Sequence, residues 1–204
     1  DNHHRNPEFF SKIFQILSNF KDQIKQIFTN KEIFDFFKSN KRILLFLIEE
    51  KIMVIDKEIA RIMINRYTNA KYHEFFYPEI KPFIYSYEIM EYESNKEIIA
   101  DNFNEKRRIG ENGRYICELI RNDMIEEFII YVNQFNISLN SQIQPSLFET
   151  NQFLLENSNS ISLIEYSAFF GSIQIFKYLY MNNVPLNSDL WLFSIHGSNP
   201  EIIV

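Results

Sequence analysis

The sequence has few of the residues that cross-link, tighten or break a chain: one cysteine, four glycines and six prolines in 204 residues. A single cysteine excludes an internal disulfide scaffold. The scattered glycines provide almost no material for a glycine-rich phosphate loop. The longest purely apolar run covers residues 43–48, far short of the roughly 20 residues that a transmembrane helix needs. We therefore expect no membrane span.

Apolar and aromatic residues are plentiful, at 46% and 16% of the chain, which excludes intrinsic disorder. With 21 Lys and Arg against 27 Asp and Glu, the net charge is −6. The one basic cluster, Lys106-Arg107-Arg108, complements the negative end of a helix, and we expect no nucleic-acid partner. The lone Cys117 is interpreted as a core residue. Low cysteine content suits an intracellular, cytoplasmic location.

Helical signals dominate the chain. Isoleucines recur at spacings of three and four, which is typical of amphipathic helices. Five pairs match the capping box, in which a Ser, Thr or Asp precedes a Glu by three residues. They are Thr29/Glu32, Ser94/Glu97, Asp123/Glu126, Ser146/Glu149 and Ser162/Glu165. We predict an all-α fold with early helices over residues 9–28, 31–38, 41–50, 57–66 and 96–108.

Gly110 and Gly113 form the most probable boundary that the sequence offers, because glycine favours helix C-caps and turns. We predict a helical N-terminal region over residues 1–110. Residues 111–204 are predicted to hold degenerate repeats of short paired helices that continue beyond Val204. The expected helices cover residues 114–121, 124–133, 147–155, 163–170, 173–181 and 190–196.

The C-terminal half contains an internal repeat. Residues 162–168 align with residues 189–195 at an offset of 27, and residues 174–176 align with residues 201–203 at the same offset. Residues 136–140 match residues 183–187 at an offset of 47. Periods of this order are typical of stacked helical hairpins.

The stretch over residues 162–179 resembles an ankyrin repeat. Ser162, Ala168, Gly171, Ile175 and Leu179 occupy matching positions. Two positions depart from the pattern, where the family has proline and histidine. They are Leu163 and Glu165.

The longer run over residues 115–204 resembles ankyrin-repeat proteins of parasitic protists that carry a domain of unknown function. Residues 120–123, 126–128, 146–151, 189–191 and 195–197 carry this resemblance together with the repeat above. Residues 42–50 and 77–83 resemble the leader region of the same proteins. The resemblance implies an all-α solenoid that holds another macromolecule, here taken to be a protein, and it implies no catalytic site.

Phe169, Phe170 and His196 are the candidate partner-binding residues. In an ankyrin-type repeat the two residues before the glycine lie at the exposed end of the first helix, and aromatic side chains are strong anchors in interfaces. The alternative is that they pack against the neighbouring helix pair, because solenoid repeats bury their faces on each other. We favour the packed alternative.

The sequence lacks a reactive constellation. Its histidines, His3, His4, His73 and His196, show no metal-ligand spacing with each other or with Cys117, so we expect no metal and no cofactor. No nucleophile elbow is present, and we expect no catalytic residues. Two other functions stay open: an enzyme with a site in the aromatic segment over residues 72–92, and a purely structural spacer.

Overall fold

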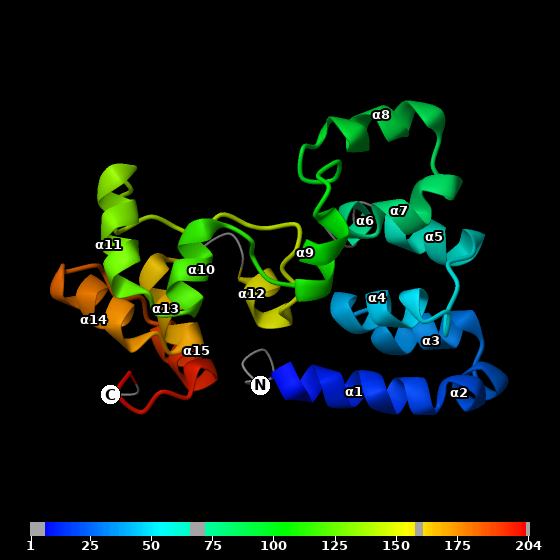
Figure 1. Cartoon of the computed structure of the whole chain (residues 1–204), viewed down its shortest axis with the longest axis horizontal. Helices are drawn as coiled ribbons and strands as arrows, with labels where there is room; N and C mark the ends of the chain where they lie inside the picture. Colours follow the sequence, from blue (N-terminus) through cyan, green and yellow to red (C-terminus); the bar gives the residue numbers. More distant parts are fainter. Residues whose placement is uncertain (1–6, 66–71, 158–160, 203–204) are drawn as a thin grey trace. The chain divides into compact units, whose positions relative to one another are not determined.

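The computed structural model describes residues 7–65, 72–157 and 161–202, and only the backbone of residues 7 and 86–88. Within these ranges the chain is all-α, as the sequence predicts, and its only β-type pairing is an isolated bridge between Gln142 and Ser162. The helices, labelled as in Figure 1, are α1 (Pro7–Asn19), α2 (Lys21–Ile27), α3 (Asn30–Phe37), α4 (Lys41–Glu49), α5 (Lys57–Ile64), α6 (Tyr72–Phe75), α7 (Tyr77–Ile80), the 3-10 turn η2 (Lys81–Phe83), α8 (Ser86–Ser94), α9 (Phe103–Ile109), α10 (Tyr115–Arg121), α11 (Ile125–Gln134), α12 (Gln152–Glu156), α13 (Leu163–Phe170), α14 (Ile173–Met181) and α15 (Leu190–Gly197).

The chain forms two compact units. The N-terminal unit consists of Glu8–Glu111 and a short inserted segment, Leu147–Gln152. The C-terminal unit includes Asn112–Ser146 and Phe153–Val204. The chain therefore passes from the second unit back into the first and out again, which the linear division at residue 110 did not anticipate.

Side-chain caps begin several helices of the N-terminal unit. The Thr29/Glu32 capping box is formed at the start of α3, with the Thr29 N–H donating to Glu32 at 2.8 Å. Asn40 accepts from the Ile43 N–H before α4, and Asp56 accepts from two N–H groups at the start of α5. These caps satisfy N–H groups that have no partner within their own helix.

The core of the N-terminal unit is filled by large apolar side chains. Phe75 and Phe76 are fully buried, and they belong to the same cluster as Leu44, Leu47 and Ile59. The inserted segment contributes Leu147 and Phe148, both 2% exposed. Its Thr150 donates from both N–H and hydroxyl to the Gly110 carbonyl, at 3.1 and 2.8 Å.

A buried arginine joins three helices of this unit. Arg107 in α9 is 2% exposed and makes a bidentate ion pair with Glu79 in α7, at 2.7 and 2.9 Å. It also donates to the Phe75 carbonyl at 2.9 Å and to the Asn104 side chain. Bidentate geometry and additional acceptors compensate the desolvation of the guanidinium.

The local predictions fail at several places. The helix predicted over residues 147–155 is reduced to α12, because Glu149 turns back and accepts from the N–H groups of Thr150 and Asn151. The predicted first helix is divided at Phe20, and the helix predicted from residue 96 begins only at Phe103. Of the five predicted capping boxes, two form: Thr29/Glu32 and Ser162/Glu165.

The C-terminal unit contains two helical hairpins with matching turns (Figure 1). The first hairpin, α10–α11, has its turn at Asp123 (φ 52°), and the second, α13–α14, turns at Gly171 (φ 61°). In both turns the next N–H reaches back five residues, from Met124 to Leu119 and from Ser172 to Ser167. This is the Schellman geometry of a helix C-terminus.

The C-terminal ends of the second helix in each hairpin, α11 and α14, match as well. Asn136 follows α11 with φ 49°, and Asn183 follows α14 with φ 57°. The N–H of Ile137 bonds the Val132 carbonyl at 2.9 Å, and the N–H of Val184 bonds the Leu179 carbonyl at 3.2 Å. The offset of 47 residues that relates the two segments in sequence therefore also relates their backbone conformation.

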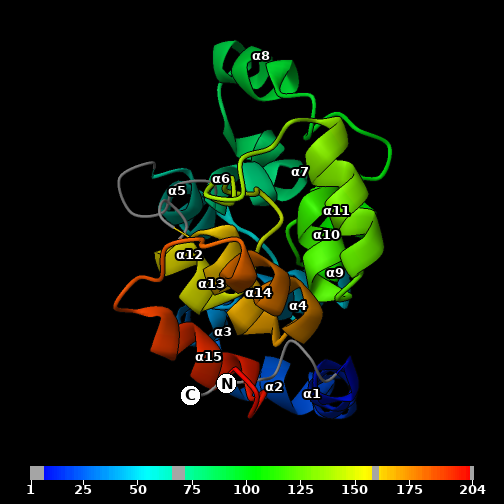
Figure 2. The same ribbon diagram turned by 90° about the vertical axis from the view of Figure 1, so that its left-hand side faces the viewer.

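The hairpins stack within the unit. The first helices of the two hairpins, α10 and α13, pack against each other, and so do the second helices, α11 and α14. We call these two sets the first-helix layer and the second-helix layer. Helix α15 continues the first-helix layer by packing against α13 (Figure 2). A Cβ atom on Gly197 of α15 would lie 2.0 Å from the Ala168 carbonyl oxygen, so this contact requires glycine.

Polar contacts between the turns fix this stacking. The carboxylate of Asp123 accepts from the backbone N–H groups of Gln174 and Ile175, both at 3.0 Å, and so caps α14 from the preceding hairpin. One turn further, Asn199 donates to the Gly171 carbonyl at 3.0 Å. Each turn is thus bonded to the next.

Candidate functional site

The two phenylalanines proposed as partner anchors lie in the core of the C-terminal unit. Phe169 is 5% and Phe170 7% exposed. Every residue of α13 is buried, because the helix has neighbours in α10, α14 and α15. The packed alternative is therefore the one that the structure contains, and neither ring is available as an exposed anchor.

His196 is half-buried and belongs to an aromatic cluster rather than to an open surface. The ring of Phe153, from α12, lies 4.3 Å from the His196 ring centroid and stacks on Phe169 at 5.7 Å. Phe193 completes the cluster, edge-on to Phe153 at 5.0 Å. Burial lowers the pKa of His196 below its usual range, so the neutral imidazole is the favoured form.

Apolar side chains that reach solvent on the first-helix layer include Tyr115 on α10, which is 49% exposed, and two residues on α15. Trp191 is 59% and Ile195 55% exposed, and they stand one turn apart on the same face. On the second-helix layer, Ile130 and Tyr180 are exposed to a similar degree.

Of the three candidate partner-binding residues, Phe169 and Phe170 on α13 are buried, as the favoured packed alternative has them, and His196 on α15 is half-buried. Trp191 and Ile195 were not among the candidates.

The basic cluster is occupied by contacts within the N-terminal unit. Arg107 is buried against Glu79, and Arg108 pairs with Glu49 at 2.9 Å. Lys106 extends over the ring of Phe148, 5.5 Å from its centroid. The predicted role was to complement the negative end of the helix, and the long-range pairs with Glu79 and Glu49 are contacts that the sequence did not reveal.

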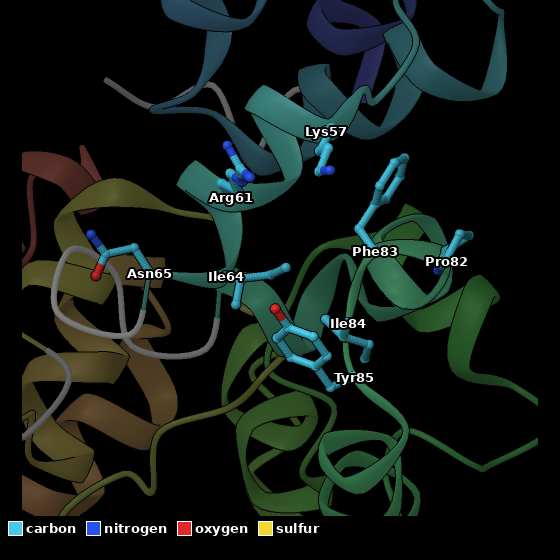
Figure 3. Close-up of a pocket in the computed structure, with 8 residues that line it drawn as sticks. All are labelled: Lys57, Arg61, Ile64, Asn65, Pro82, Phe83, Ile84 and Tyr85. Carbon is cyan, nitrogen blue, oxygen red and sulfur yellow. The ribbon is translucent and has the colours of Figure 1, made fainter.

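A groove of about 600 Å³ lies beside α5 in the N-terminal unit (Figure 3). Lys57, Arg61 and Ile64 line it from α5, and Asn65 follows that helix. The facing residues come from η2 and the segment after it. They are Pro82, Phe83, Ile84 and Tyr85.

The charges and rings of this groove are accessible. Lys57 and Arg61 are exposed, one turn apart, and neither has a carboxylate partner among the residues that the structure describes. Phe83 is 39% and Tyr85 70% exposed. The described lining contains two cations and no carboxylate, histidine, cysteine or serine. Such a surface suits anions and apolar groups, and its described residues offer no acid–base pair.

The other aromatic side chains that the structure describes over residues 72–92 make packing contacts. Tyr72 is buried, and burial raises the pKa of its phenol. Tyr77 stacks on Tyr92 with ring centroids 4.9 Å apart, and His73 lies edge-on to Tyr92. Tyr77 donates to Glu93, which also pairs with Lys81 at 2.7 Å. These described side chains are therefore in contact with one another.

The described residues show no metal cluster and no membrane-spanning helix. Within the described ranges, no group of three or more His, Cys, Asp or Glu side chains has a metal-binding arrangement, and His3 and His4 lie outside those ranges. Among the helices described, none is long and apolar enough to cross a membrane.

Some residues of the candidate sites carried no signal in the sequence. Lys57 and Arg61 have the spacing of ordinary exposed helix residues, and only the fold places them opposite Phe83 and Tyr85. Phe153 lies in the segment that interrupts the repeat, so the repeat alignment excluded it.

Comparisons with protein-family models, with curated proteins and with solved structures found no match to this chain.

Proposed function

We propose that this protein is a noncatalytic scaffold of ankyrin-like helical repeats that binds another protein through its C-terminal unit. The observation that carries the proposal is the recurrence of one hairpin: the same two left-handed turns and the same capping bonds occur in α10–α11 and α13–α14. Repeats that stack in register build an extended surface from equivalent helices, which suits the binding of a macromolecule.

The exposed apolar face of α15 supports a protein partner. Trp191 and Ile195 expose large apolar area at a spacing that places both on one face. Tryptophan is enriched among the residues that dominate binding energy in interfaces, where it fills a pocket on the partner. We propose that the partner contacts the first-helix layer there, with His196 at the rim of the contact.

The polar groups support a noncatalytic role. The buried charges are used by the fold, as in the Arg107–Glu79 pair, and the accessible groove lacks a nucleophile–base arrangement. An enzyme with a site over residues 72–92 is the weaker candidate, because the described aromatic side chains there either pack against each other, as Tyr72 with Phe76 and Tyr77 with Tyr92 do, or line a groove without a described acid–base pair. A purely structural spacer needs no exposed apolar face, whereas α15 exposes Trp191 and Ile195.

The test is affinity capture with matched surface variants. Trp191→Ser with Ile195→Ser removes the proposed contact, whereas Ile130→Ser with Tyr180→Ser removes equally exposed apolar side chains from the second-helix layer. We expect one defined partner to be enriched by the unmodified chain and by the second-layer variant, and to be lost with the α15 variant. A partner retained equally by all three proteins contradicts the proposed surface, and no enriched partner contradicts the proposed function.

A further inference from the structure

We propose that the groove beside α5 binds an extended acidic peptide in which carboxylate residues alternate with apolar ones. This site lies in the N-terminal unit and is independent of the α15 surface. The observation that carries it is a groove with two different walls, one bearing Lys57 and Arg61 and the other bearing exposed aromatic and aliphatic side chains (Figure 3).

The positive charge of the groove favours a negatively charged ligand. The chain as a whole carries a net charge of −6, yet the only charged groups among the described residues of this lining are two cations. The fold uses other cations internally, since Arg107 and Arg108 each pair with a glutamate. Lys57 and Arg61 have no such partner in the described part of the chain. Complementary charge in a ligand would attract it to this surface and exclude basic competitors.

The spacing of the two cations fits an extended chain. Residues four apart on a helix have Cβ atoms about 5–6 Å apart. In an extended peptide, residues two apart lie about 6.6 Å apart and point to the same side. Two carboxylates separated by one residue can therefore reach Lys57 and Arg61 together. The intervening residues then point to the opposite side.

The opposite wall suits apolar side chains. Phe83 and Tyr85 have exposed rings, Pro82 is exposed beside Phe83, and the buried Ile84 lies between the two rings in the chain. A volume of about 600 Å³ falls in the range of roughly 300–1,000 Å³ typical of ligand sites. It accommodates a few peptide side chains. A free phosphate would use the cations but leave this wall uncovered, and the lining contains no glycine-rich turn to hold it.

The experiment is a fluorescence-anisotropy titration of the full chain with a labelled octapeptide in which glutamate alternates with leucine. We expect saturable binding that weakens as salt rises, and at least about tenfold weaker binding when Lys57→Glu and Arg61→Glu are combined. The matched control combines Lys96→Glu and Arg114→Glu, which change the net charge equally at exposed positions outside the groove, and it should retain most of the affinity. Circular dichroism verifies that each variant is folded, and Arg61→Gln replaces the double variant if that protein does not fold.

Three further arms identify the ligand. A peptide with glutamine in place of glutamate should bind at least about tenfold more weakly, and so should one with serine in place of leucine. A peptide with lysine in place of glutamate should bind the double variant better than the unmodified chain. Equal binding of the glutamine peptide, an unchanged affinity in the double variant, or displacement of the peptide by inorganic phosphate at millimolar concentration would each overturn the proposal.

Discussion

The two units join their short helices by different kinds of contact. The N-terminal unit uses long side chains, and its centre is the Arg107 guanidinium, which reaches α7, α6 and its own helix. The C-terminal unit uses close backbone contact and repeated turns, as at Gly197 against Ala168 and at Asp123 against α14. A central side chain such as Arg107 can join helices that are arranged irregularly. A repeated turn, in contrast, allows another copy of the same hairpin to stack on the previous one.

The largest predicted effect is in the N-terminal unit. Glu79→Ala leaves Arg107 buried without its carboxylate, which costs about 4 kcal/mol in the free energy of unfolding. Hydrogen exchange should show the loss of protection first in α6, α7 and α9. The matched control is Asp35→Ala, which removes the exposed pairs with Lys31 and Lys38 and should change stability little. Equal losses in the two variants would contradict the role of Arg107 as the centre of this unit.

The counterpart in the C-terminal unit is Gly197→Ala. The added Cβ would meet the Ala168 carbonyl oxygen at 2.0 Å, so α15 must move away from α13. We expect a loss of about 3 kcal/mol, because overpacking against backbone cannot be relieved by a rotamer change. Hydrogen exchange should locate the loss in α13 and α15. Ser198→Gly is the control, since its φ of 46° suits glycine and it should be neutral or stabilising. A fully stable Gly197→Ala protein would show that the helices are not in close contact.

The contact between successive turns gives a smaller effect. Asp123→Ala removes the carboxylate that caps α14 and places a less tolerant residue at φ 52°. We expect a loss of about 1.5 kcal/mol in urea unfolding. Asp123→Asn retains one acceptor oxygen and tolerance of this conformation, so it should lose less. If the two variants unfold at the same urea concentration, the cap contributes nothing.

The smallest predicted effect is a pH dependence. Burial lowers the pKa of His196 in the folded chain, so the unfolded chain binds more protons between the two pKa values. Stability contributed by neutral His196 is therefore present above its ordinary pKa near 6.5 and is lost as the pH falls through that value towards the folded pKa. His196→Phe should flatten this part of the profile in thermal melts from pH 7 to pH 5. An unchanged slope would mean that His196 titrates normally.

Sequence reasoning succeeded where the determining interactions are local. The capping boxes at Thr29 and Ser162 form within four residues, and the offset of 47 marks turns with the same backbone. It failed where the partner is distant in the chain. Nothing near Glu149 indicates that Leu147–Gln152 joins the N-terminal unit.

The candidate sites show the same difference between local and distant interactions. The aromatic character of Phe169 and Phe170 was visible, but their burial depends on neighbouring helices. The groove was not predictable either, because Lys57 and Arg61 meet Phe83 and Tyr85 only through the packing of α5 against η2.

Site-specific photo-crosslinking on the two helix layers tests the proposed scaffold most directly. A benzophenone amino acid would replace Trp191 on α15 in one protein and Tyr180 on α14 in another, both positions being more than half exposed. The account predicts one discrete crosslinked protein partner from position 191 and none, or far less, from position 180. Equal crosslinking from both positions, or none from position 191, would contradict binding through the first-helix layer.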